Sequence, residues 1–304
     1  MDPRCFFVIG AQKGGTTALF EYLRGHPEVY MPPEKEAEFF TRCDTTPAAW
    51  AEYRKRLLTP PRPVRVVGTA SPQYMGDPAV PARMAAVVPD ALLIAVLRDP
   101  VERAVSHYKM AYRRGEERRD FARAVREQLQ PEALEKARAL PFREVAERDA
   151  YVVWGEYARI LRGFLDHFPR EQLLLLYSED LRERGPESLR RVYRHLGISE
   201  NRLPPNLGRL YHVGGARRKV PGLEKILRSA LARGLIRLAV SKRRYKRTQM
   251  KLERWNAKPG ALAIPGETYD CLADHYAGDI EELSRLSGVR PRWFEHRGES
   301  SVAL

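Results

Sequence analysis

The sequence is poor in cysteine and has no long apolar run. Its three cysteines, Cys5, Cys43 and Cys271, are odd in number and far apart. This arrangement fits neither a disulfide framework nor a metal-ligand pattern, so we expect reduced thiols and no metal site. No apolar stretch approaches the roughly 20 residues of a membrane-spanning helix, and the first apolar segment starts too early to leave room for a secretion signal. We therefore expect a soluble, cytoplasmic protein.

Signatures of nucleic-acid binding are also missing, although the chain is strongly basic. It has 53 Lys and Arg against 39 Asp and Glu, which gives a formal net charge of +14. Such a charge implies an acidic partner: a nucleotide, a sulfated or phosphorylated substrate, or an anionic surface. The sequence contains no zinc-finger spacing, no RNA-recognition signature and no basic stretch interleaved with aromatics. We expect no nucleic-acid partner, and the charge alone leaves the other acidic partners open.

Internal repeats, heptad seams and low-complexity segments are absent as well. The 304 residues, of which 43% are hydrophobic, are enough for one large α/β domain. Apolar strands followed by loops and helices recur at 6–10, 64–67, 91–97 and 173–177. This recurrence predicts a parallel, doubly wound sheet flanked by helices. We expect a single domain, 1–304, with helical insertions at about 115–170 and 211–250 that cover the site.

The segment FFVIGAQKGGTTALF near the N-terminus reads as a buried strand, a glycine-rich turn and the start of a helix. Gly14 and Gly15 permit positive φ and close backbone approach, and Thr16 or Thr17 is suited to begin the helix. Amides at such a helix start bind anions. The segment therefore predicts a phosphate site, and the alternative is a turn that only tightens the strand–helix junction.

This turn lacks the lysine of an ordinary phosphate loop. Gly10, Gly15 and Thr17 match the pattern G-x-x-x-x-G-K-S/T, but Thr16 stands where the pattern has lysine. The only cation of the loop is Lys13, three residues earlier. Because a nucleotide kinase needs the standard lysine on the transferred phosphate, the displaced cation predicts a different phosphate chemistry.

Two further segments carry charged residues at places where a parallel sheet builds a ligand site. Glu36 and Glu38 point the same way from an extended backbone, either as a polar loop edge or as carboxylates whose repulsion raises one pKa toward that of a general base. Arg98 ends the most apolar strand, and Ser106 lies two turns into the next helix. Together they are compatible with one anion site, or with a surface ion pair and an ordinary serine.

A basic amphipathic segment lies near the C-terminal third of the chain. Residues 223–240 have an apolar side, and the segment 228–247 carries many Lys and Arg. This composition is compatible with peripheral contact to an acidic protein or a membrane surface. The composition favours, however, the solvated basic face of a packed helix.

In order and spacing, these blocks resemble PAPS-dependent sulfotransferases, in particular the branch with the heparan sulfate N- and 3-O-sulfotransferases and their bacterial relatives. PAPS is 3′-phosphoadenosine 5′-phosphosulfate, and PAP is the product that remains after transfer. The matching blocks are FFVIGAQKGGTTALFEYLRGHPEVY, PEKEAEFF, ASPQYM, LLIAVLRDPVERAVSHY, GEYARIL, LLLLYSEDLRE and LADHYAGDIEELSRLSG. The resemblance implies a P-loop-like α/β fold. It also implies metal-free sulfuryl transfer to a hydroxyl, less readily an amine, of a small-molecule, lipid, polyketide or carbohydrate acceptor.

The resemblance also assigns roles to residues of the donor site. The 5′-phosphosulfate loop of the family falls on Gln12, Lys13, Gly14, Gly15, Thr16 and Thr17. Lys13 would hold the bridging oxygen and stabilise the departing PAP, which explains the displaced cation. The 3′-phosphate motif falls on Arg98 and Ser106, and the loop over the nucleotide has a loose counterpart at Arg217.

On the acceptor side, Glu36 matches the catalytic base of the family. The other residues expected there are Glu38, Ser71, Tyr74 and Tyr157. Heparan-modifying relatives often carry His or Gln in place of Glu38, and they carry Glu-Lys in place of Thr69 and Ala70. The absence of that lysine argues against a highly sulfated glycan acceptor.

Two other functions remain as alternatives from the sequence. One is a nucleotide kinase that uses ATP and Mg²⁺, against which Thr16 argues. The other is a non-catalytic interaction module that uses the basic segment 228–247. Tight binding of PAP without Mg²⁺ would distinguish the sulfotransferase from both.

Overall fold

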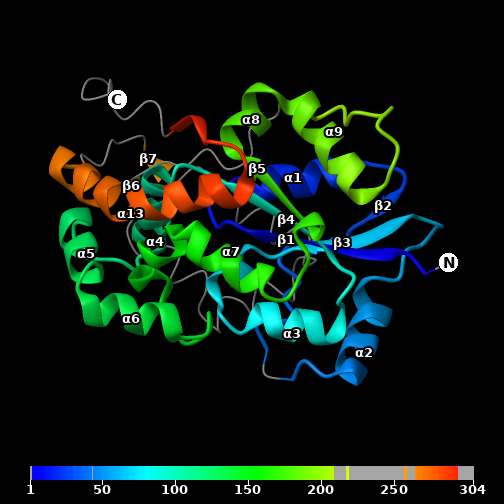
Figure 1. Cartoon of the computed structure of the whole chain (residues 1–304), viewed down its shortest axis with the longest axis horizontal. Coiled ribbons are helices and arrows are strands. Elements are labelled where there is room, and N and C mark those ends of the chain that lie inside the picture. Colours follow the sequence, from blue (N-terminus) through cyan, green and yellow to red (C-terminus); the bar gives the residue numbers. More distant parts are fainter. Residues whose placement is uncertain (1, 43, 209–216, 219–256, 259–263, 294–304) are drawn as a thin grey trace, which may run out of the picture.

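The computed structural model describes residues 2–42, 44–208, 217–218, 257–258 and 264–293 (Figure 1). Its centre is a five-stranded sheet in the order β2-β3-β1-β4-β5, in which every pair of neighbours is parallel. The strands are β1 (Arg4–Gly10), β2 (Val29–Tyr30), β3 (Val66–Ala70), β4 (Leu92–Leu97) and β5 (Leu173–Tyr177). The predicted parallel α/β sheet is confirmed.

Strand β1 occupies the middle of the sheet, and all of its residues after Arg4 are buried. Phe7 and Ile9 belong to the apolar cluster on one face, whereas Phe6 and Val8 belong to the cluster on the other. Because helices cover both faces, the strand reads as a continuous apolar run without alternation. The end of this strand therefore delivers the phosphate loop to the centre of the carboxyl edge.

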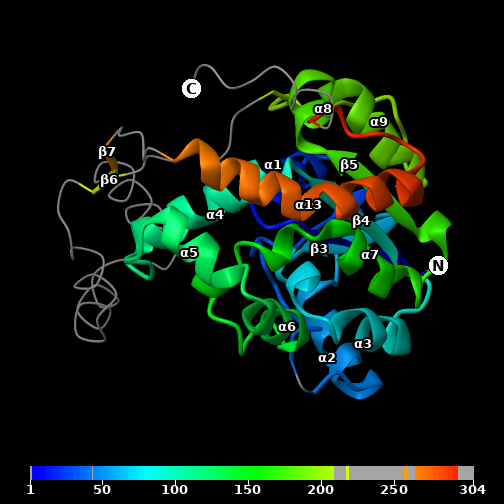
Figure 2. The ribbon, with the colours of Figure 1, turned by 60° about the vertical axis from the view of Figure 1, so that its left-hand side comes forward.

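Helices lie on both faces of the sheet (Figures 1 and 2). The apolar cluster of one face draws on α1 (Thr16–Leu23), α8 (Ser178–Glu183) and α9 (Gly185–Leu196). The cluster of the other face draws on α2 (Pro47–Leu57), α3 (Val80–Val87), α7 (Tyr157–Leu165) and the C-terminal part of α13 (Gly266–Ser287). A third cluster joins α4 (Pro100–Arg114), α5 (Phe121–Gln128) and α13 near the carboxyl edge.

The connection between α5 and α7 forms the described part of the predicted helical insertions. It contains α6 (Pro131–Ala139) and the short 3₁₀ turns η2 (Glu147–Asp149) and η3 (Val153–Gly155). Within the predicted range 115–170, α7 packs its apolar side on the sheet. The second predicted insertion, 211–250, lies outside the described residues except for Arg217–Arg218, which pairs with Ala257–Lys258 as the antiparallel strands β6 and β7.

Two strand boundaries differ from the prediction. The second predicted strand was expected at 64–67, but β3 begins at Val66 and continues to Ala70 because Phe6, Phe7 and Val8 of β1 pair with Gly68, Thr69 and Ala70. Strand β2 is not among the strands predicted from the sequence. In both places the pairing with a neighbouring strand decides the structure, and local sequence does not.

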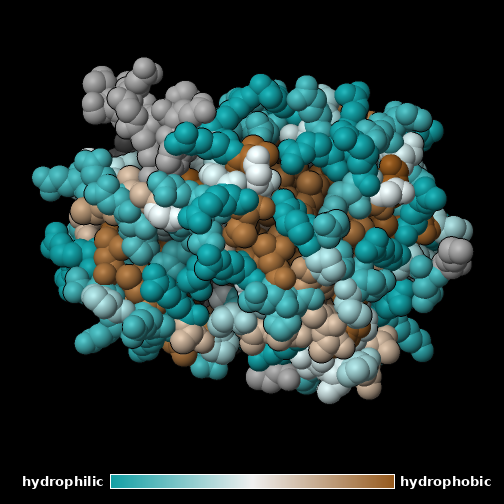
Figure 3. All heavy atoms as spheres, viewed as in Figure 1, coloured by the Kyte–Doolittle hydropathy of each residue, from teal (hydrophilic) through white to brown (hydrophobic). Residues whose placement is uncertain are grey.

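The surface seen in Figure 3 is mostly hydrophilic, with small hydrophobic patches between the charged side chains. Large hydrophobic residues that are exposed in the described part of the chain are Tyr112, Leu203 and Val289. Among the described helices, none is long and apolar enough to cross a membrane.

Glu156 ties α6, α7 and α13 together and gives a test of the fold. Its buried carboxylate binds Arg138 Nη2 at 2.7 Å, Arg159 Nε at 2.5 Å and His275 Nε2 at 3.0 Å. Burial alone would raise the pKa of Glu156, but the hydrogen bonds from His275 and Arg138 and the charge of Arg159 lower it to about 2.

We expect Glu156→Gln to lower the free energy of unfolding at pH 7 by about 3 kcal/mol, because the neutral amide cannot replace a buried carboxylate among cations. The depressed pKa places the full contribution above pH 4.5, and the contribution disappears as pH falls through 2. Urea denaturation of both proteins at pH 7 and pH 3 should therefore show a smaller difference at the lower pH. Glu132→Gln, at an exposed position of α6, serves as the control, and equal losses in the two variants would contradict the assignment.

Candidate active site

The phosphate loop follows β1 and is pressed against the end of β4. Ala11 N donates to Val96 O at 2.8 Å, and Gly14 N donates to Ala11 O at 2.9 Å. A Cβ at Gly14 would lie 2.1 Å from Val96 O, so only glycine fits there. Gly15, at φ 109°, precedes the first residue of α1, and the first amides of that helix have no acceptor within it. The loop thus presents free N–H groups at a helix start, as an anion site requires.

Lys13 lies in a strained and strongly positive part of this loop. Its φ of 71° is in the left-handed region, which residues other than glycine seldom adopt. Burial first, and then the charges of Arg113, Arg114, Arg98 and Arg103 in that order, lower the pKa of Lys13 to about 8. Its Nζ lies 3.8 Å from the Met110 sulfur, a weak acceptor. This cation-rich environment fits a multiply charged anion.

The second predicted anion motif lies beside the loop, where β4 ends and α4 begins. Arg98 Nη2 contacts Glu102 Oε2 at 3.0 Å, and the Tyr269 hydroxyl donates to the same carboxylate. Ser106 lies four residues after Glu102 and therefore on the same side of α4. The half-buried Arg98 is thus held by a carboxylate at the place where the prediction puts a phosphate.

Glu36 is positioned at the end of β3, beside β1. Its amide donates to Ala70 O at 3.1 Å, and its φ is 65°. Lys35 Nζ donates to the carboxylate at 2.7 Å. Burial alone would raise the pKa of Glu36, but the charge of Lys35 and the hydrogen bonds from Lys35 and Gln73 outweigh burial and lower it. Glu36 is therefore ionised and able to accept a proton.

Glu38 behaves in the opposite way. Burial raises its pKa, and repulsion by Glu36 and Glu147 adds to this effect, whereas the hydrogen bond from Thr41 and the charge of Arg143 oppose it. The prediction that one of the paired carboxylates has a raised pKa thus falls on Glu38, with burial as the first cause and repulsion as a minor one. Thr41 Oγ1 donates to Glu38 at 2.8 Å.

Three residues predicted at the acceptor side are fully buried. Tyr74 accepts a hydrogen bond from the Phe39 amide at 3.0 Å, and the Tyr157 hydroxyl donates to Arg98 O at 2.9 Å. Ser71, whose amide binds Val8 O, is equally inaccessible. In this structure the three residues are therefore closed off from solvent, and their expected role as acceptor contacts stays a prediction. Arg217 begins β6, and its side chain lies outside the described residues.

Several site residues were missed by the sequence interpretation. Gln73 hydrogen-bonds Glu36. Arg103 is fully buried below the cation cluster and donates to Tyr151 O and, at 3.4 Å, to His107 Nδ1. The four-residue spacing of Arg103 and His107 on α4 was a visible signal. Gln73 had no comparable signal, because its contact depends on how two loops meet.

Comparisons with known proteins point to the same family as the motifs of the site. The family described as "Sulfotransferase domain" matches residues 3–211. The mouse "Heparan sulfate glucosamine 3-O-sulfotransferase 3B1" is 33% identical over 198 residues, which are 63% of this chain and 45% of that protein. The human "Heparan sulfate glucosamine 3-O-sulfotransferase 6" is 32% identical over 197 residues, which are 63% of this chain and 51% of that protein.

The chain thus spans about half the length of the curated relatives it matches. A solved sulfotransferase from Alicyclobacillus acidocaldarius shares the fold with a TM-score of 0.66 at 22% identity, over 97% of this chain and 99% of that one. The family match covers more than half of this sequence, and it includes the phosphate loop, Glu36, Arg98 and Ser106. This chain therefore belongs to the sulfotransferase domain family.

Proposed function

We propose that this protein transfers a sulfuryl group from PAPS to a hydroxyl of a polar, carbohydrate-like acceptor. The observation that carries the proposal is the backbone of the two predicted catalytic residues. Within the described part of the chain, Lys13 and Glu36 are the only residues other than glycine that have a positive φ. Such strain, of order 1 kcal/mol or more at each position, is characteristic of functional sites. Lys13 follows β1, and Glu36 binds Ala70 at the carboxyl end of the neighbouring strand β3.

The residues at this edge fit the donor. The free amides at the start of α1 and the Lys13 ammonium suit a 5′-phosphosulfate, and Arg98 with Ser106 suits a 3′-phosphate. When bound, PAPS supplies the activated sulfuryl group. Lys13 then provides positive charge where the leaving oxygen becomes negative, and Glu36 accepts the proton of the acceptor hydroxyl.

The charges around Glu36 and Glu38 favour a polar acceptor over a lipid or a polyketide. The ionic groups that act on the two carboxylates are Lys35, Arg114, Arg143 and Glu147. An alkyl chain would have to desolvate these groups without replacing their hydrogen bonds, which is costly. The relatives named above carry a glucosamine acceptor in their names, and the buried Thr69 and Ala70 in β3 supply no cation for a highly sulfated glycan.

Calorimetric titration tests the donor assignment, and transfer of radiolabelled sulfate from PAPS tests the acceptor class. We expect PAP to bind without Mg²⁺ and ATP to bind weakly or not at all. With bound donor, glucosamine-containing oligosaccharides of low sulfation should accept sulfate, and long-chain alcohols should not. Binding of ATP with Mg²⁺ in preference to PAP would contradict the donor assignment. Sulfation of the alcohols alone would contradict the acceptor class.

A further inference from the structure

A carboxylate of the helical insertion reaches the phosphate loop. Glu147, in η2, accepts a hydrogen bond from Gln12 Nε2 at 3.4 Å and one from Arg114 Nη1 at 3.1 Å, both on Oε2. His107 Nε2 lies 3.8 Å from the same oxygen. Gln12 directly precedes Lys13, and Arg114 is the last residue of α4. Glu147 therefore contacts the donor loop and a cation of the site at once.

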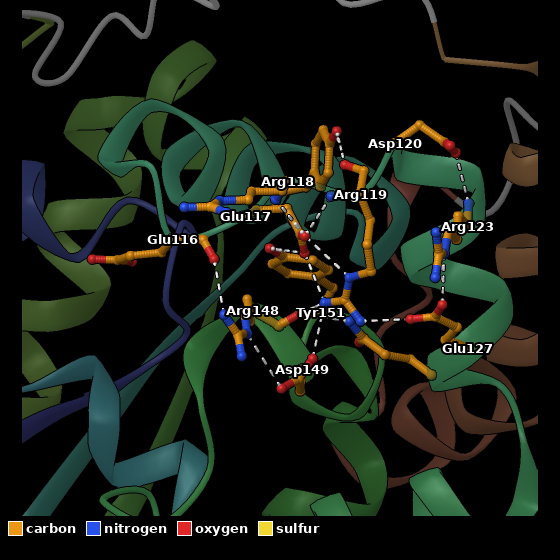
Figure 4. Close-up of polar contacts among 12 residues, drawn as sticks. Glu116, Glu117, Arg118, Arg119, Asp120, Arg123, Glu127, Arg148, Asp149 and Tyr151 are labelled. Carbon is orange, nitrogen blue, oxygen red and sulfur yellow. Dashed lines mark hydrogen bonds and ion pairs between the residues drawn. The ribbon is translucent and has the colours of Figure 1, made fainter. Parts of the chain in front are cut away.

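An ion network binds Arg148 and Asp149, the two residues that follow Glu147 (Figure 4). Arg119 lies at the centre of this network and binds Glu117 at 2.7 Å, Glu127 at 2.8 Å and Asp149 at 2.9 Å. Its Nη2 also donates to the Arg148 carbonyl at 2.9 Å, an oxygen that accepts from Gln128 as well. The two residues after Glu147 are thus anchored to the α4–α5 loop and to α5, which holds the backbone next to Glu147 in place.

The partners of Glu147 show what it does electrostatically. Burial lowers the pKa of His107 to about 4, so this ring is neutral at pH 7 and Arg114 supplies the opposing charge. Arg114 in turn acts on both Lys13 and Glu36. The Gln12 Oε1 atom is buried and has no hydrogen-bond partner among the described residues, so Gln12 is oriented by its contact with Glu147.

We propose that Glu147 is a positioning residue that holds Gln12 and Arg114 in place at the boundary between the donor loop and the acceptor side. Through the Arg119 network, the helical insertion would thereby set the geometry of the phosphate loop. The importance of this contact for donor binding rests on the function proposed above. The effect of Glu147 on the phosphate loop of the free protein is independent of that function.

Hydrogen–deuterium exchange of the free protein tests the loop directly. Glu147→Ala should speed exchange of the amides in residues 11–17 by about fivefold, the scale of one lost hydrogen bond. Glu116→Ala is the matched control, because Glu116 lies 3.9 Å from the same Arg114 and, among the described residues, forms no hydrogen bond or ion pair with the loop. Unchanged exchange in Glu147→Ala would overturn the proposal. If Glu147→Ala does not fold, Gln12→Ala removes the same contact from the loop side and should give the same increase.

Measurement of PAP affinity distinguishes a positioning role of Glu147 from a purely electrostatic effect of its charge. Loss of a negative charge near an anion site strengthens binding, whereas loss of loop geometry weakens it. We expect Glu147→Ala to bind PAP about fivefold more weakly, and Glu147→Gln, which keeps an acceptor oxygen, to bind at least as tightly as the wild type. Equal or tighter binding by Glu147→Ala would overturn the proposal. If the wild type fails to bind PAP while loop exchange responds to Glu147→Ala, the donor assignment fails and the positioning role stands.

Discussion

Replacing Lys13 with alanine is expected to lower the rate of sulfuryl transfer by at least about 100-fold, the usual loss when one group that stabilises developing charge is removed. The ammonium is the only cation within the tight turn from Gly10 to Thr17. Its backbone conformation and the close packing of Gly14 on Val96 fix the place from which it acts. Turnover of PAPS with a saturating acceptor is the measurement.

The pH dependence of donor binding gives Lys13 a second signature. Burial, aided by the neighbouring arginines, lowers the pKa of Lys13 to about 8 in the free protein. A bound anion favours the charged amine, so binding takes up a proton above pH 8. PAP affinity should therefore fall as pH rises from 7 to 9, by up to about tenfold per unit above 8. Lys13→Ala should remove this fall.

Lys109→Ala is a suitable control, because Lys109 lies on α4 beside Met110, the residue that contacts the Lys13 ammonium. The substitution removes one positive charge nearby, and we expect transfer to change by less than about twofold. Comparable losses in both variants would indicate a general effect of charge. Near-normal turnover by Lys13→Ala would remove Lys13 from the mechanism.

The parts of the fold that the sequence predicted are those fixed by local patterns. The apolar runs at 91–97 and 173–177 correspond to β4 and β5, and the glycine-rich turn corresponds to the loop before α1. Strand β2 has two residues in a segment interrupted by prolines, so no local pattern marks it. It exists because Val29 and Tyr30 pair with Val66 and Val67 of β3.

The same distinction holds for the site. Lys13, Arg98 and Ser106 belong to compact motifs next to strand ends, which sequence spacing makes visible. The contact between Gln12 and Glu147 joins residues 135 positions apart, and no spacing rule predicts it. Tyr74 and Tyr157 were placed at the acceptor side from their motifs. Whether their side chains are buried depends on the packing of η1 (Pro72–Gly76) and α7 against the sheet, which their motifs do not reveal.

Replacing Glu36 with glutamine is expected to lower transfer by about 100-fold, because the amide keeps the size and hydrogen bonding of the side chain but cannot accept a proton. PAP binding should stay close to that of the wild type, since Glu36 follows β2 and not the donor loop. Measurement of kcat with oligosaccharide acceptor, beside PAP affinity by calorimetry, separates the two effects. A loss of PAP binding equal to the loss of rate would contradict the role as base.

Glu38→Gln distinguishes the two carboxylates. Glu38 has the raised pKa and would be the natural base if basicity alone decided the choice. Its hydrogen bond with Thr41 and its ordinary backbone, however, show no positioning comparable to that of Glu36, which adopts a positive φ and binds Ala70 O. We expect Glu38→Gln to lower kcat by less than about tenfold. A loss as large as that of Glu36→Gln would mean that the pair shares the proton.

The pH profile of transfer then identifies which carboxylate, Glu36 or Glu38, is the general base. A base must be deprotonated to act, so the rate falls on the acid side as pH drops through its pKa. Because Lys35 and Gln73 lower the pKa of Glu36, the acid limb should lie below the ordinary range of a glutamate. Lys35→Met should move this limb to higher pH, since it removes the main charge that keeps Glu36 ionised. An acid limb above the ordinary range, unmoved by Lys35→Met, would instead identify Glu38 as the base.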